Sequence, residues 1–455
     1  MSFFAGDSRL YAPLFGDADL AALLSDEASV ARMVQTEAAL ARVQTQLGLI
    51  PAGAAEAISA LEENFAPDLD ALAAGVAHDG LPVIALLGQL RQQLGPEAAP
   101  WLHWGATTQD ILDTALVLGL REALEVLEGR LLGVVRALAA LADRHRHTVM
   151  AGRTHSQQAL PTTFGLKVAG WLAPLLRWHE RLTQLRPRLL VVQFGGAAGT
   201  LASLGTAGLE VQAALARELG LGVPLLPWHT GRDTLAELAG WLSGCSGSLA
   251  KMSQDIILLT QTEVGEVRES ADTSRGGSST MPQKSNPVIS ELVVAAARSC
   301  AGLLSGMHHA LIQEHERATH GWQLEWLSLP PMLALCGSSL RHSLDLARNL
   351  VVDAARMEAN VQASGGLMLA ETLSFALSGP LGRARAGQLV KAAVQTAVKE
   401  GRPLVAVLRE MSAAELQSEG QSLNWDNFTE ANTLGTSEEM IDRVLEAAAR
   451  VNGAT

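Results

Sequence analysis

Aromatic and charged residues are both scarce in this chain. Its 455 residues include a single tyrosine, and Phe, Trp and Tyr together make up 4%. Strands favour aromatic and β-branched residues, whereas helices favour the Ala and Leu that dominate here. Charged residues account for 18% and hydrophobic residues for 48%, which excludes an intrinsically disordered chain. These proportions predict a globular, all-α protein with a large core.

Cysteine is scarce as well. Cys245, Cys300 and Cys336 are odd in number, far apart and surrounded by apolar residues. We therefore expect reduced core thiols of an intracellular protein rather than disulfides. Residues 1–7 lack the basic start and the long apolar run of a secretion signal, and no uninterrupted apolar stretch is long enough to span a membrane. The sequence thus predicts a cytoplasmic protein without a membrane partner.

Several ligand-binding motifs are also missing. The chain has no His-Glu-x-x-His or Cys-x-x-Cys pair, so we expect no metal site. It has neither a Gly-x-Gly-x-x-Gly motif nor a phosphate-binding Gly-Lys-Ser/Thr loop, so no nucleotide cofactor is expected. The net charge of −13 argues against nucleic acid as a partner. It does not exclude a small anionic substrate, because a local field can oppose the net charge.

The most distinctive stretch covers residues 276–287, Gly-Gly-Ser-Ser-Thr-Met-Pro-Gln-Lys-Ser-Asn-Pro. Its glycines and small hydroxyl residues predict a loop, in which Lys284 supplies a cation. We expect Asn286 to cap the next helix and Pro287 to occupy its first position. Donor groups at a helix N-terminus suit a carboxylate or another oxyanion. A Gly/Ser surface linker is the alternative, although it would not require the second half of the motif.

Apolar periodicity predicts helices along most of the chain. The clearest run, 234–267, places apolar residues at alternating spacings of three and four, which is typical of a bundle seam. A polar turn is expected at 151–158. Helices this long and apolar predict self-association in a symmetric oligomer. The other expected helices cover residues 29–47, 51–63, 68–76, 81–94, 110–144, 161–185, 288–313 and 333–350.

The expected helices group into three sections. An N-terminal helical domain covers residues 1–109, a central long-helix domain 110–352 and a C-terminal helical domain 353–455. Glycine and proline predict breaks within the last section, at residues 365–366, 379–380 and 401–403.

Three polar clusters interrupt the apolar helical patterns. They are residues 103–110, residues 152–155 and the loop 276–287 with Glu291 behind it. Each has an ordinary structural reading: Thr107 and Thr108 as helix caps, the histidine of the second cluster as a hydrogen-bonding group, and Glu291 as a carboxylate favoured by a helix dipole. Together they also match a chemical need. Elimination β to a carboxylate requires a base, donors for the developing dianion and an acid for the leaving group.

The three clusters resemble the signature regions of the fumarase/aspartase superfamily, and the 277–287 motif is highly specific to it. The resemblance covers nearly the whole chain and weakens towards the C-terminus. It implies the three-section lyase 1 superfamily fold with a central long-helix bundle. It also implies a homotetramer with a twenty-helix core, in which each site is shared between subunits. The implied partner is a small dicarboxylate or tricarboxylate substrate, and no cofactor is implied.

The resemblance also assigns roles to residues. Ser278 would be the base, and His155, partnered by Glu291, would be the acid. Lys284 and Asn286 would bind a substrate carboxylate. The remaining substrate-binding candidates are Thr107, Thr108, Thr154, Gln261, Ser279, His103, His78 and Arg317.

Within the superfamily, the sequence is similar to the 3-carboxy-cis,cis-muconate cycloisomerase branch, next to adenylosuccinate lyase. Residues 103–110, 193–197, 227–233 and 313–317 carry this similarity. The bacterial cycloisomerases have Trp where this chain has His155 and an apolar residue where it has Glu291. The His/Glu pair of the eliminating lyases is thus intact here.

A histidine with a carboxylate partner suits the expulsion of an amine, because its pKa lies near neutrality. We therefore expect a lyase that releases fumarate from an N-substituted aspartate. Three alternatives stay open. They are the cycloisomerase, adenylosuccinate lyase (for which His78 and Arg317 would serve) and a catalytically inert, crystallin-like homologue.

Overall fold

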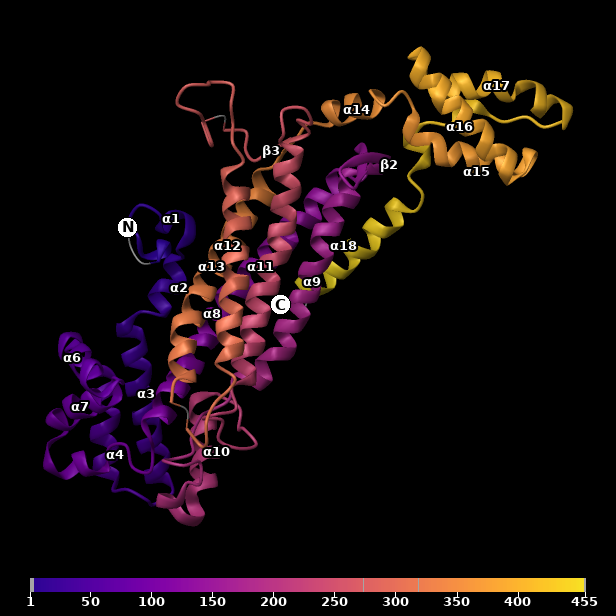
Figure 1. The fold of residues 1–455 in the computed structure, drawn as a ribbon. Helices are drawn as coiled ribbons and strands as arrows, with labels where there is room; N and C mark the ends of the chain where they lie inside the picture. Colours follow the sequence, from indigo (N-terminus) through magenta and orange to yellow (C-terminus); the bar gives the residue numbers. More distant parts are fainter. Residues whose placement is uncertain (1–3, 273, 318, 454–455) are drawn as a thin grey trace. The chain divides into compact units, whose positions relative to one another are not determined.

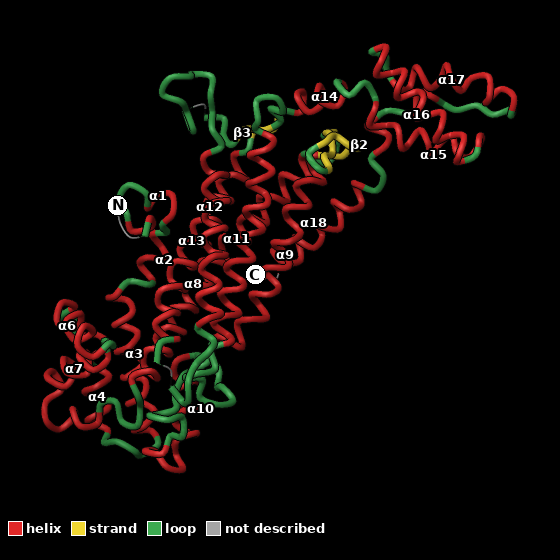
Figure 2. The backbone as a smooth tube through the Cα atoms, in the orientation of Figure 1, coloured by secondary structure: helices red, strands yellow, loops and turns green. Residues whose placement is uncertain are grey.

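The computed structural model describes residues 4–272, 274–317 and 319–453, and it consists mainly of helices (Figure 1, Figure 2). The first three residues of the segment inspected for a secretion signal lie outside the described residues. The chain forms two compact units. Unit 1 comprises Met1–Leu131, Trp178–Gly247 and Ala295–Arg341, and unit 2 comprises Leu132–Arg177, Ser248–Val294 and His342–Thr455. The predicted division into three sections stays a prediction.

Long helices dominate the middle of the chain, and each contributes residues to both units. The predicted all-α class is confirmed, because the strands that the structure describes are few and short. The long helices are α8 (Thr108–Arg144), α9 (Phe164–Leu189), α11 (Asp233–Leu259), α12 (Val288–His309) and α13 (Gly321–Asn349).

Small residues allow these helices to pack closely. A Cβ atom on Gly244 of α11 would overlap the Trp178 ring of α9, and one on Gly306 of α12 would overlap the Ser328 side chain of α13. The predicted seam of α11 is confirmed, since its apolar residues from Leu235 to Leu259 at spacings of three and four are buried. As predicted, the three cysteines are free and buried on α11, α12 and α13.

The ends of the long helices differ from the prediction. Helix α11 stops at Leu259 rather than Val267, because the Gln261 carbonyl turns the chain by accepting the N–H groups of Val264 and Gly265. The chain then forms β3 (Val267–Arg268), which pairs with β4 (Val351–Val352). Helix α12 ends before residue 313. Helix α13 starts twelve residues before 333 and continues through Pro330 and Pro331, so the predicted boundary was wrong.

Unit 1 also contains the N-terminal helices, which match the predictions to within a few residues, except that 51–63 forms two helices. Helix α3 packs against α4, α5 and α10, and Val30, Met33 and Leu86 lie in the shared core. The elements are η1 (Ala5–Asp7), α1 (Ala12–Phe15), α2 (Ala18–Leu23), α3 (Asp26–Gln46), α4 (Ala52–Ser59), α5 (Leu61–Asn64), α6 (Leu69–Asp79), α7 (Val83–Ala98), η2 (Ala99–Trp101), η3 (Ala202–Ala207) and α10 (Gly208–Leu219).

Unit 2 contains a β-hairpin where the sequence predicted a polar turn. Strands β1 (Val149–Thr154) and β2 (Gln157–Thr163) pair antiparallel, with Thr154 opposite Gln157. The sequence signal was hidden, because hairpin turns with two positive φ values usually contain glycine or asparagine, and here His155 and Ser156 adopt them.

The C-terminal part of unit 2 is helical. Helices α15, α16 and α17 pack around Leu373, Leu389 and Leu408. The predicted break at 379–380 was wrong, because both residues lie inside α15, whereas Gly401 does end α16. The elements are α14 (Ala354–Gln362), η4 (Leu367–Leu369), α15 (Ala370–Leu381), α16 (Arg383–Glu400), α17 (Leu404–Ser418), η5 (Trp425–Asn427), η6 (Glu430–Thr433) and α18 (Ser437–Gly453).

Helix α12 is the one helix among the described residues that has the length and composition to cross a membrane. Apolar helices in the cores of water-soluble proteins have the same properties, so this finding is weak evidence for a membrane span. Cytoplasmic location and the absence of a membrane partner therefore stay predictions.

Candidate active site

The loop 276–287 is closed at its neck by hydrogen bonds between its two ends. The Gly276 carbonyl accepts the Asn286 main-chain N–H at 2.9 Å and the Asn286 side-chain amide at 2.8 Å. Gly276 has φ +69°, and a Cβ atom there would overlap the main chain of Asn286. Only glycine fits this neck, because it tolerates both the positive φ and the close approach. The conformation therefore holds Ser278 and Lys284 on one closed loop.

Ser278 follows the Gly277–Ser285 bridge next to the neck of this loop and receives hydrogen bonds at its hydroxyl oxygen. Oγ accepts the N–H of Met281 at 3.2 Å and that of Thr280 at 3.4 Å. Donors directed at this oxygen favour its deprotonated form over the neutral hydroxyl. The local fold thus supplies part of what a serine base requires.

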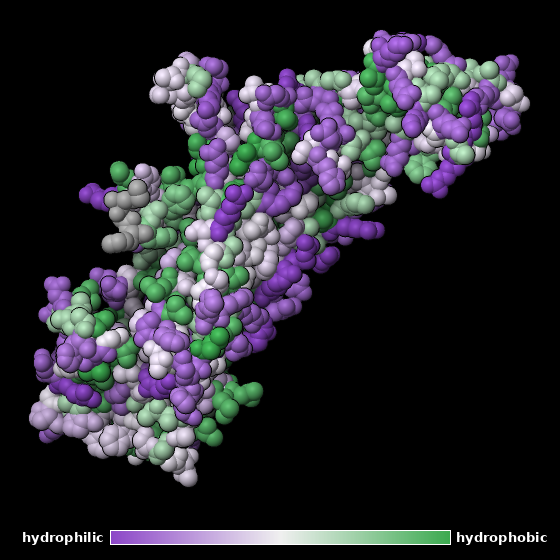
Figure 3. Space-filling view, viewed as in Figure 1, coloured by the Kyte–Doolittle hydropathy of each residue, from purple (hydrophilic) through white to green (hydrophobic). Residues whose placement is uncertain are grey.

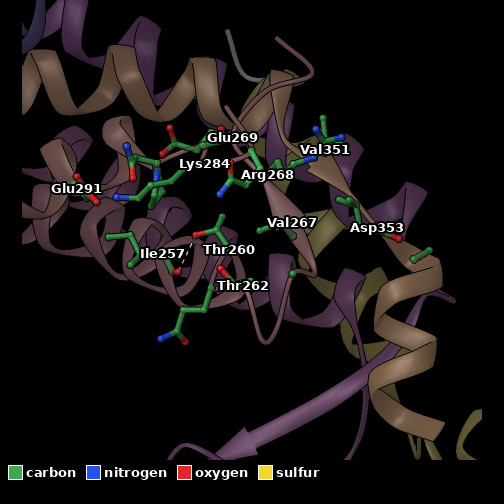
Figure 4. A pocket seen from close by; sticks show the side chains of 18 residues that line it. Ile257, Thr260, Thr262, Val267, Arg268, Glu269, Lys284, Glu291, Val351 and Asp353 are labelled. Atoms are coloured by element: carbon green, nitrogen blue, oxygen red, sulfur yellow. Dashed lines mark hydrogen bonds between the residues drawn. The ribbon is translucent and has the colours of Figure 1, made fainter. Parts of the chain in front are cut away.

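A cavity of about 660 Å³ lies in unit 2, between the second half of this loop, the end of α11 and strands β3 and β4 (Figure 4). Four predicted site residues line it: Gln261, Lys284, Asn286 and Glu291. Thr260, Thr262, Arg268 and Glu269 also line it and were not among the predicted site residues. The available signal was the polar stretch from residue 260 to residue 263, which lies inside the segment 234–267 predicted as one helix.

Glu269 caps α12, a role that the sequence analysis gave to Asn286. Its carboxylate oxygens accept the N–H of Ile289 at 3.2 Å and that of Ser290 at 2.6 Å. The prediction for Asn286 was wrong, because its side chain closes the loop neck instead. A buried carboxylate is also the better partner for the positive end of a helix.

His155 occupies the exposed tip of the β1–β2 hairpin, with φ +47°. A non-glycine residue in this region costs of order 1 kcal/mol or more, and such strain tends to gather at functional sites. Thr154 precedes it and is also exposed. Among the described residues, no hydrogen bond or ion pair joins His155 to Glu291 within one chain. Their partnership stays a prediction.

A buried carboxylate ties the hairpin to the cavity segment of unit 2. Arg153 donates to both oxygens of Glu266, at 2.7 and 3.0 Å, and Asn360 donates to Oε1 at 2.8 Å. Glu266 lies directly before β3 and is fully buried. Because one carboxylate holds both the β1 arginine and the α14 asparagine, the end of β1 next to the hairpin tip is tied to the segment before β3.

In unit 1, the structure brings together three other predicted residues: Thr107, Thr108 and Arg317. The guanidinium donates to both threonine hydroxyls, through Nη1 to Thr107 and through Nη2 to Thr108 at 3.2 Å. The hydroxyls are therefore held by an arginine rather than used as helix caps. Asp110 caps instead, by accepting the Thr107 N–H at 3.0 Å.

Asp110 also holds the segment 193–197, one of the motifs singled out in the sequence. Its carboxylate accepts the N–H groups of Gly195 and Gly196, both at 2.9 Å, and contacts His229 Nε2 at 2.7 Å. A Cβ atom on Gly195 would overlap Pro227, which explains why glycine is required there. This single buried carboxylate organises the turn at the start of α8.

A second buried network lies one helical turn further along α8. Arg232 donates to both oxygens of Asp113, at 2.7 and 3.0 Å, and to both of Glu325, at 2.8 and 2.5 Å. Burial alone would lower the Arg232 pKa, but the two carboxylates outweigh it and raise the pKa. Burial raises the pKa of Glu325 despite the adjacent guanidinium. The charges of Arg232, Asp113 and Glu325 are thus paired with one another inside the protein.

The remaining two histidine candidates, both in unit 1, differ in their surroundings. His103 has φ +66° and contacts Glu37 through Nδ1 at 2.6 Å, beneath the surface. Burial opposes its charged form, but the Glu37 carboxylate outweighs burial and raises the His103 pKa. His78 is exposed near the end of α6 and contacts only its neighbour Asp79 among the described residues.

The structure therefore gathers the predicted residues into separate groups. One group lines the cavity of unit 2, and another surrounds Arg317 in unit 1. Ser278, Ser279, Thr154 and His155 belong to unit 2 but do not line this cavity. Among the described residues, no group of three or more His, Cys, Asp or Glu side chains could hold a metal ion.

Sequence comparison finds one matching family model and many related proteins. The family model described as Lyase matches residues 19–302. The chain is 45% identical over 406 residues to a 3-carboxy-cis,cis-muconate cycloisomerase of Pseudomonas aeruginosa, covering 88% of each protein.

Structure comparison finds close similarity to solved enzymes. The 3-carboxy-cis,cis-muconate lactonizing enzyme of Pseudomonas putida superposes with a TM-score of 0.89 at 41% identity, covering 97% of this chain and 99% of that one. A fumarate lyase from Mesorhizobium sp. BNC1 superposes with a TM-score of 0.88 at 42% identity, covering 95% and 98%.

Proposed function

Because this chain belongs to the Lyase family within the fumarase/aspartase superfamily, we propose that it catalyses addition and elimination next to a substrate carboxylate, specifically the cycloisomerisation of 3-carboxy-cis,cis-muconate. The observation that carries the proposal is the similarity over nearly the full chain to proteins of that name. It favours this reaction over the amine-releasing lyase that the sequence motifs alone suggested.

In the proposed reaction, a substrate carboxylate oxygen forms a bond to an alkene carbon. The alkene electron pair moves to the neighbouring carbon, which takes a proton from the Ser278 hydroxyl, and the product is a lactone. The Ser278 alkoxide then regains a proton from solvent, so the turnover takes up one proton. In the reverse direction, Ser278 removes that proton while the carbon–oxygen bond breaks. Lys284 and Asn286 bind the carboxylate next to the reacting carbon, which accumulates negative charge. The N–H groups on Ser278 Oγ support the proton transfer, because they stabilise its alkoxide.

The direct test is turnover of 3-carboxy-cis,cis-muconate, followed by the loss of its conjugated absorbance and by NMR identification of the product. We expect conversion to a lactone by the native chain. The Ser278→Ala variant should lose this activity while keeping its helical circular dichroism spectrum. Absence of turnover by a folded native protein would refute the proposal.

The pair of His155 and Glu291 favours a second candidate: a lyase that releases fumarate from an N-substituted aspartate. An amine is a poorer leaving group than a carboxylate, so its expulsion benefits from an acid such as a histidine. The similarity to a solved fumarate lyase supports the same candidate. A panel of succinyl-amines, assayed for fumarate beside 3-carboxymuconate, separates the two reactions.

A variant of His155 tests its role in this second candidate. If His155 protonates the leaving amine, His155→Ala will slow amine release much more than deuterium exchange at the carbon that loses the proton. Equal losses in both measurements would exclude His155 as the leaving-group acid.

We further propose that copies of the chain associate as a homotetramer and complete the site for one another. Ser278 and His155 both lie outside the lining of the unit 2 cavity, so this cavity does not contain all the candidate catalytic residues of the chain. Apolar side chains are also exposed, among them Leu225 and Leu226 on the loop after α10, where Figure 3 shows hydrophobic surface. In the amine-release assay of the second candidate, mixing and reannealing Ser278→Ala and His155→Ala chains should restore part of the activity that each variant lacks alone. No recovery in mixed tetramers would argue against shared sites.

A further inference from the structure

Arg268 is a cation at the unit 2 cavity for which the proposed chemistry has no role. It is exposed and lines the cavity together with Lys284 (Figure 4). Within the described part of the chain, its guanidinium forms no hydrogen bond or ion pair. Two other arginines of unit 2 differ, since Arg153 is bound to Glu266 and Arg356 to main-chain carbonyls. Arg268 is thus available to an anionic ligand.

The main chain around Arg268 is held firmly. Val267 is 1% exposed, and strand alternation therefore directs the next side chain away from the core and towards the cavity. On one side, the Glu266 carbonyl accepts the Asp353 N–H at 3.0 Å, and on the other side Glu269 is bound to the start of α12. The position of the arginine is therefore set by the fold, and only its side chain has to adjust to a ligand.

The carboxylates of this cavity do not neutralise Arg268. Glu269 is already bound to the N–H groups of Ile289 and Ser290, and Asp353 accepts the N–H of Arg356 at the start of α14. In Figure 4, Glu291 and Asp353 lie at opposite sides of the pocket. Two cations from different elements, Lys284 from the loop and Arg268 from β3, thus line one cavity without partners among the described residues.

We propose that Arg268 binds a second carboxylate of the substrate, distinct from the one held by Lys284 and Asn286, and thereby selects substrates with an additional carboxylate. An arginine fork suits this role, because it can hold both oxygens of a carboxylate in one plane. The inference rests on the proposed function, in which the loop residues hold one carboxylate. It assigns to Arg268 the contact with a carboxylate beyond the one that the loop holds.

Calorimetric binding of two unreactive ligands tests the inference. Glutarate and butyrate share a three-carbon chain with one terminal carboxylate and differ by the second terminal carboxylate. The native chain should bind glutarate about 10- to 100-fold more tightly, the range expected for one charge-assisted pair. The Arg268→Gln variant should lose this preference while its affinity for butyrate stays unchanged. Arg268→Lys should restore part of the preference, because it keeps the charge but not the planar fork.

Arg409→Gln is the matched control, since it makes the same charge change at an exposed residue of α17 outside the cavity. It should leave both affinities unchanged. The inference is overturned if the native chain shows no preference, if Arg268→Gln keeps the preference, or if that variant weakens both ligands equally.

Because these ligands do not react, the result does not depend on the reaction proposed above. A native chain that does not convert 3-carboxymuconate, yet prefers glutarate to butyrate through Arg268, would refute the reaction and keep the inference. The reverse outcome is also possible: the native chain converts 3-carboxymuconate, but Arg268→Gln leaves KM, kcat and the ligand preference unchanged. That outcome would support the reaction and refute the inference.

Discussion

Arg232 in unit 1 and Lys284 in unit 2 are both cations in polar regions of the molecule, but their surroundings differ completely. Arg232 is buried and donates four hydrogen bonds to Asp113 and Glu325. Lys284 is exposed at a cavity and has no partner among the described residues. The first cation has its charge satisfied by the fold and so contributes to structure. The second leaves its charge unsatisfied, which is what binding of an anionic substrate requires.

The same contrast extends to the groups around each cation. Asp110 and Asp113 hold the start of α8 through bonds to main-chain and side-chain donors. The loop that carries Ser278 is instead closed only at its neck, and its tip is largely exposed. A less constrained loop that carries the proposed base suits a site that has to open and close around its substrate.

The largest effect is expected from removing the base on the loop. Ser278→Ala should reduce kcat by about 10²- to 10⁴-fold, the usual contribution of a positioned acid–base group, with no change in Tm. Steady-state kinetics and thermal unfolding of the same preparation measure both quantities. A fully active variant would show that this loop does not carry the base.

In unit 1, a large effect on stability rather than on activity is expected. Arg232→Met should lower the free energy of unfolding by about 3–5 kcal/mol, because it leaves the Asp113 and Glu325 carboxylates buried without a counter-charge. Urea unfolding followed by circular dichroism measures the change. The matched control is Arg188→Gln, which breaks an exposed pair with Glu237 and should leave the unfolding midpoint unchanged. Similar losses in the two variants would contradict the contrast drawn above.

Removing the unpaired cation should affect binding but not stability. Lys284→Met should weaken glutarate binding by about 10- to 100-fold, the contribution of one charge-assisted bond. Its Tm should equal that of the native chain, because no described residue depends on the ammonium group. Calorimetry and thermal unfolding measure the two effects. A marked drop in Tm would show that Lys284 is structural.

The smallest effect is expected from the titration of His103. Its folded pKa is raised above the ordinary value of 6.5, because the Glu37 carboxylate outweighs burial. The stabilisation is therefore fully present below pH 6.5 and is lost as the pH rises through the raised pKa. The unfolding midpoint of the native chain should decrease over this range more than that of His103→Gln. Parallel pH profiles for the two proteins would exclude the Glu37–His103 pair as the cause.

Much of the fold was predictable, because it depends on local patterns. The spacing of apolar residues located the long helices, and the buried seam of α11 follows it. The failures lie where a distant residue decided the local structure. Val267 and Arg268 form a strand rather than the end of α11, because they pair with Val351 and Val352, and α12 is capped by Glu269, directly after β3, rather than by Asn286. Neither partner is visible in a sequence window.

The candidate site likewise has residues that the sequence identified and a residue that only the structure identified. Motif spacing identified Lys284, Asn286 and Glu291, and the structure places all three at one cavity. Motif spacing could not identify Arg268, because this residue lies in no recognisable motif. Arg268 becomes a candidate only in the structure, where the adjacent Val267 is buried in the core and Arg268 lines the cavity.

The sequence by itself determined the helical class, the superfamily and the identity of the chemical groups, because residue composition, apolar spacing and a twelve-residue motif encode them locally. Only the tertiary structure decided which charged side chains are paired and which are available to a ligand. In the sequence, Arg232 and Lys284 are both simply cationic residues. They differ because the fold brings two carboxylates within hydrogen-bonding distance of Arg232 and, among the described residues, none within that distance of the Lys284 ammonium group. Such distances depend on residues far apart in the chain, as Asp113, Arg232 and Glu325 are, and no local pattern records them.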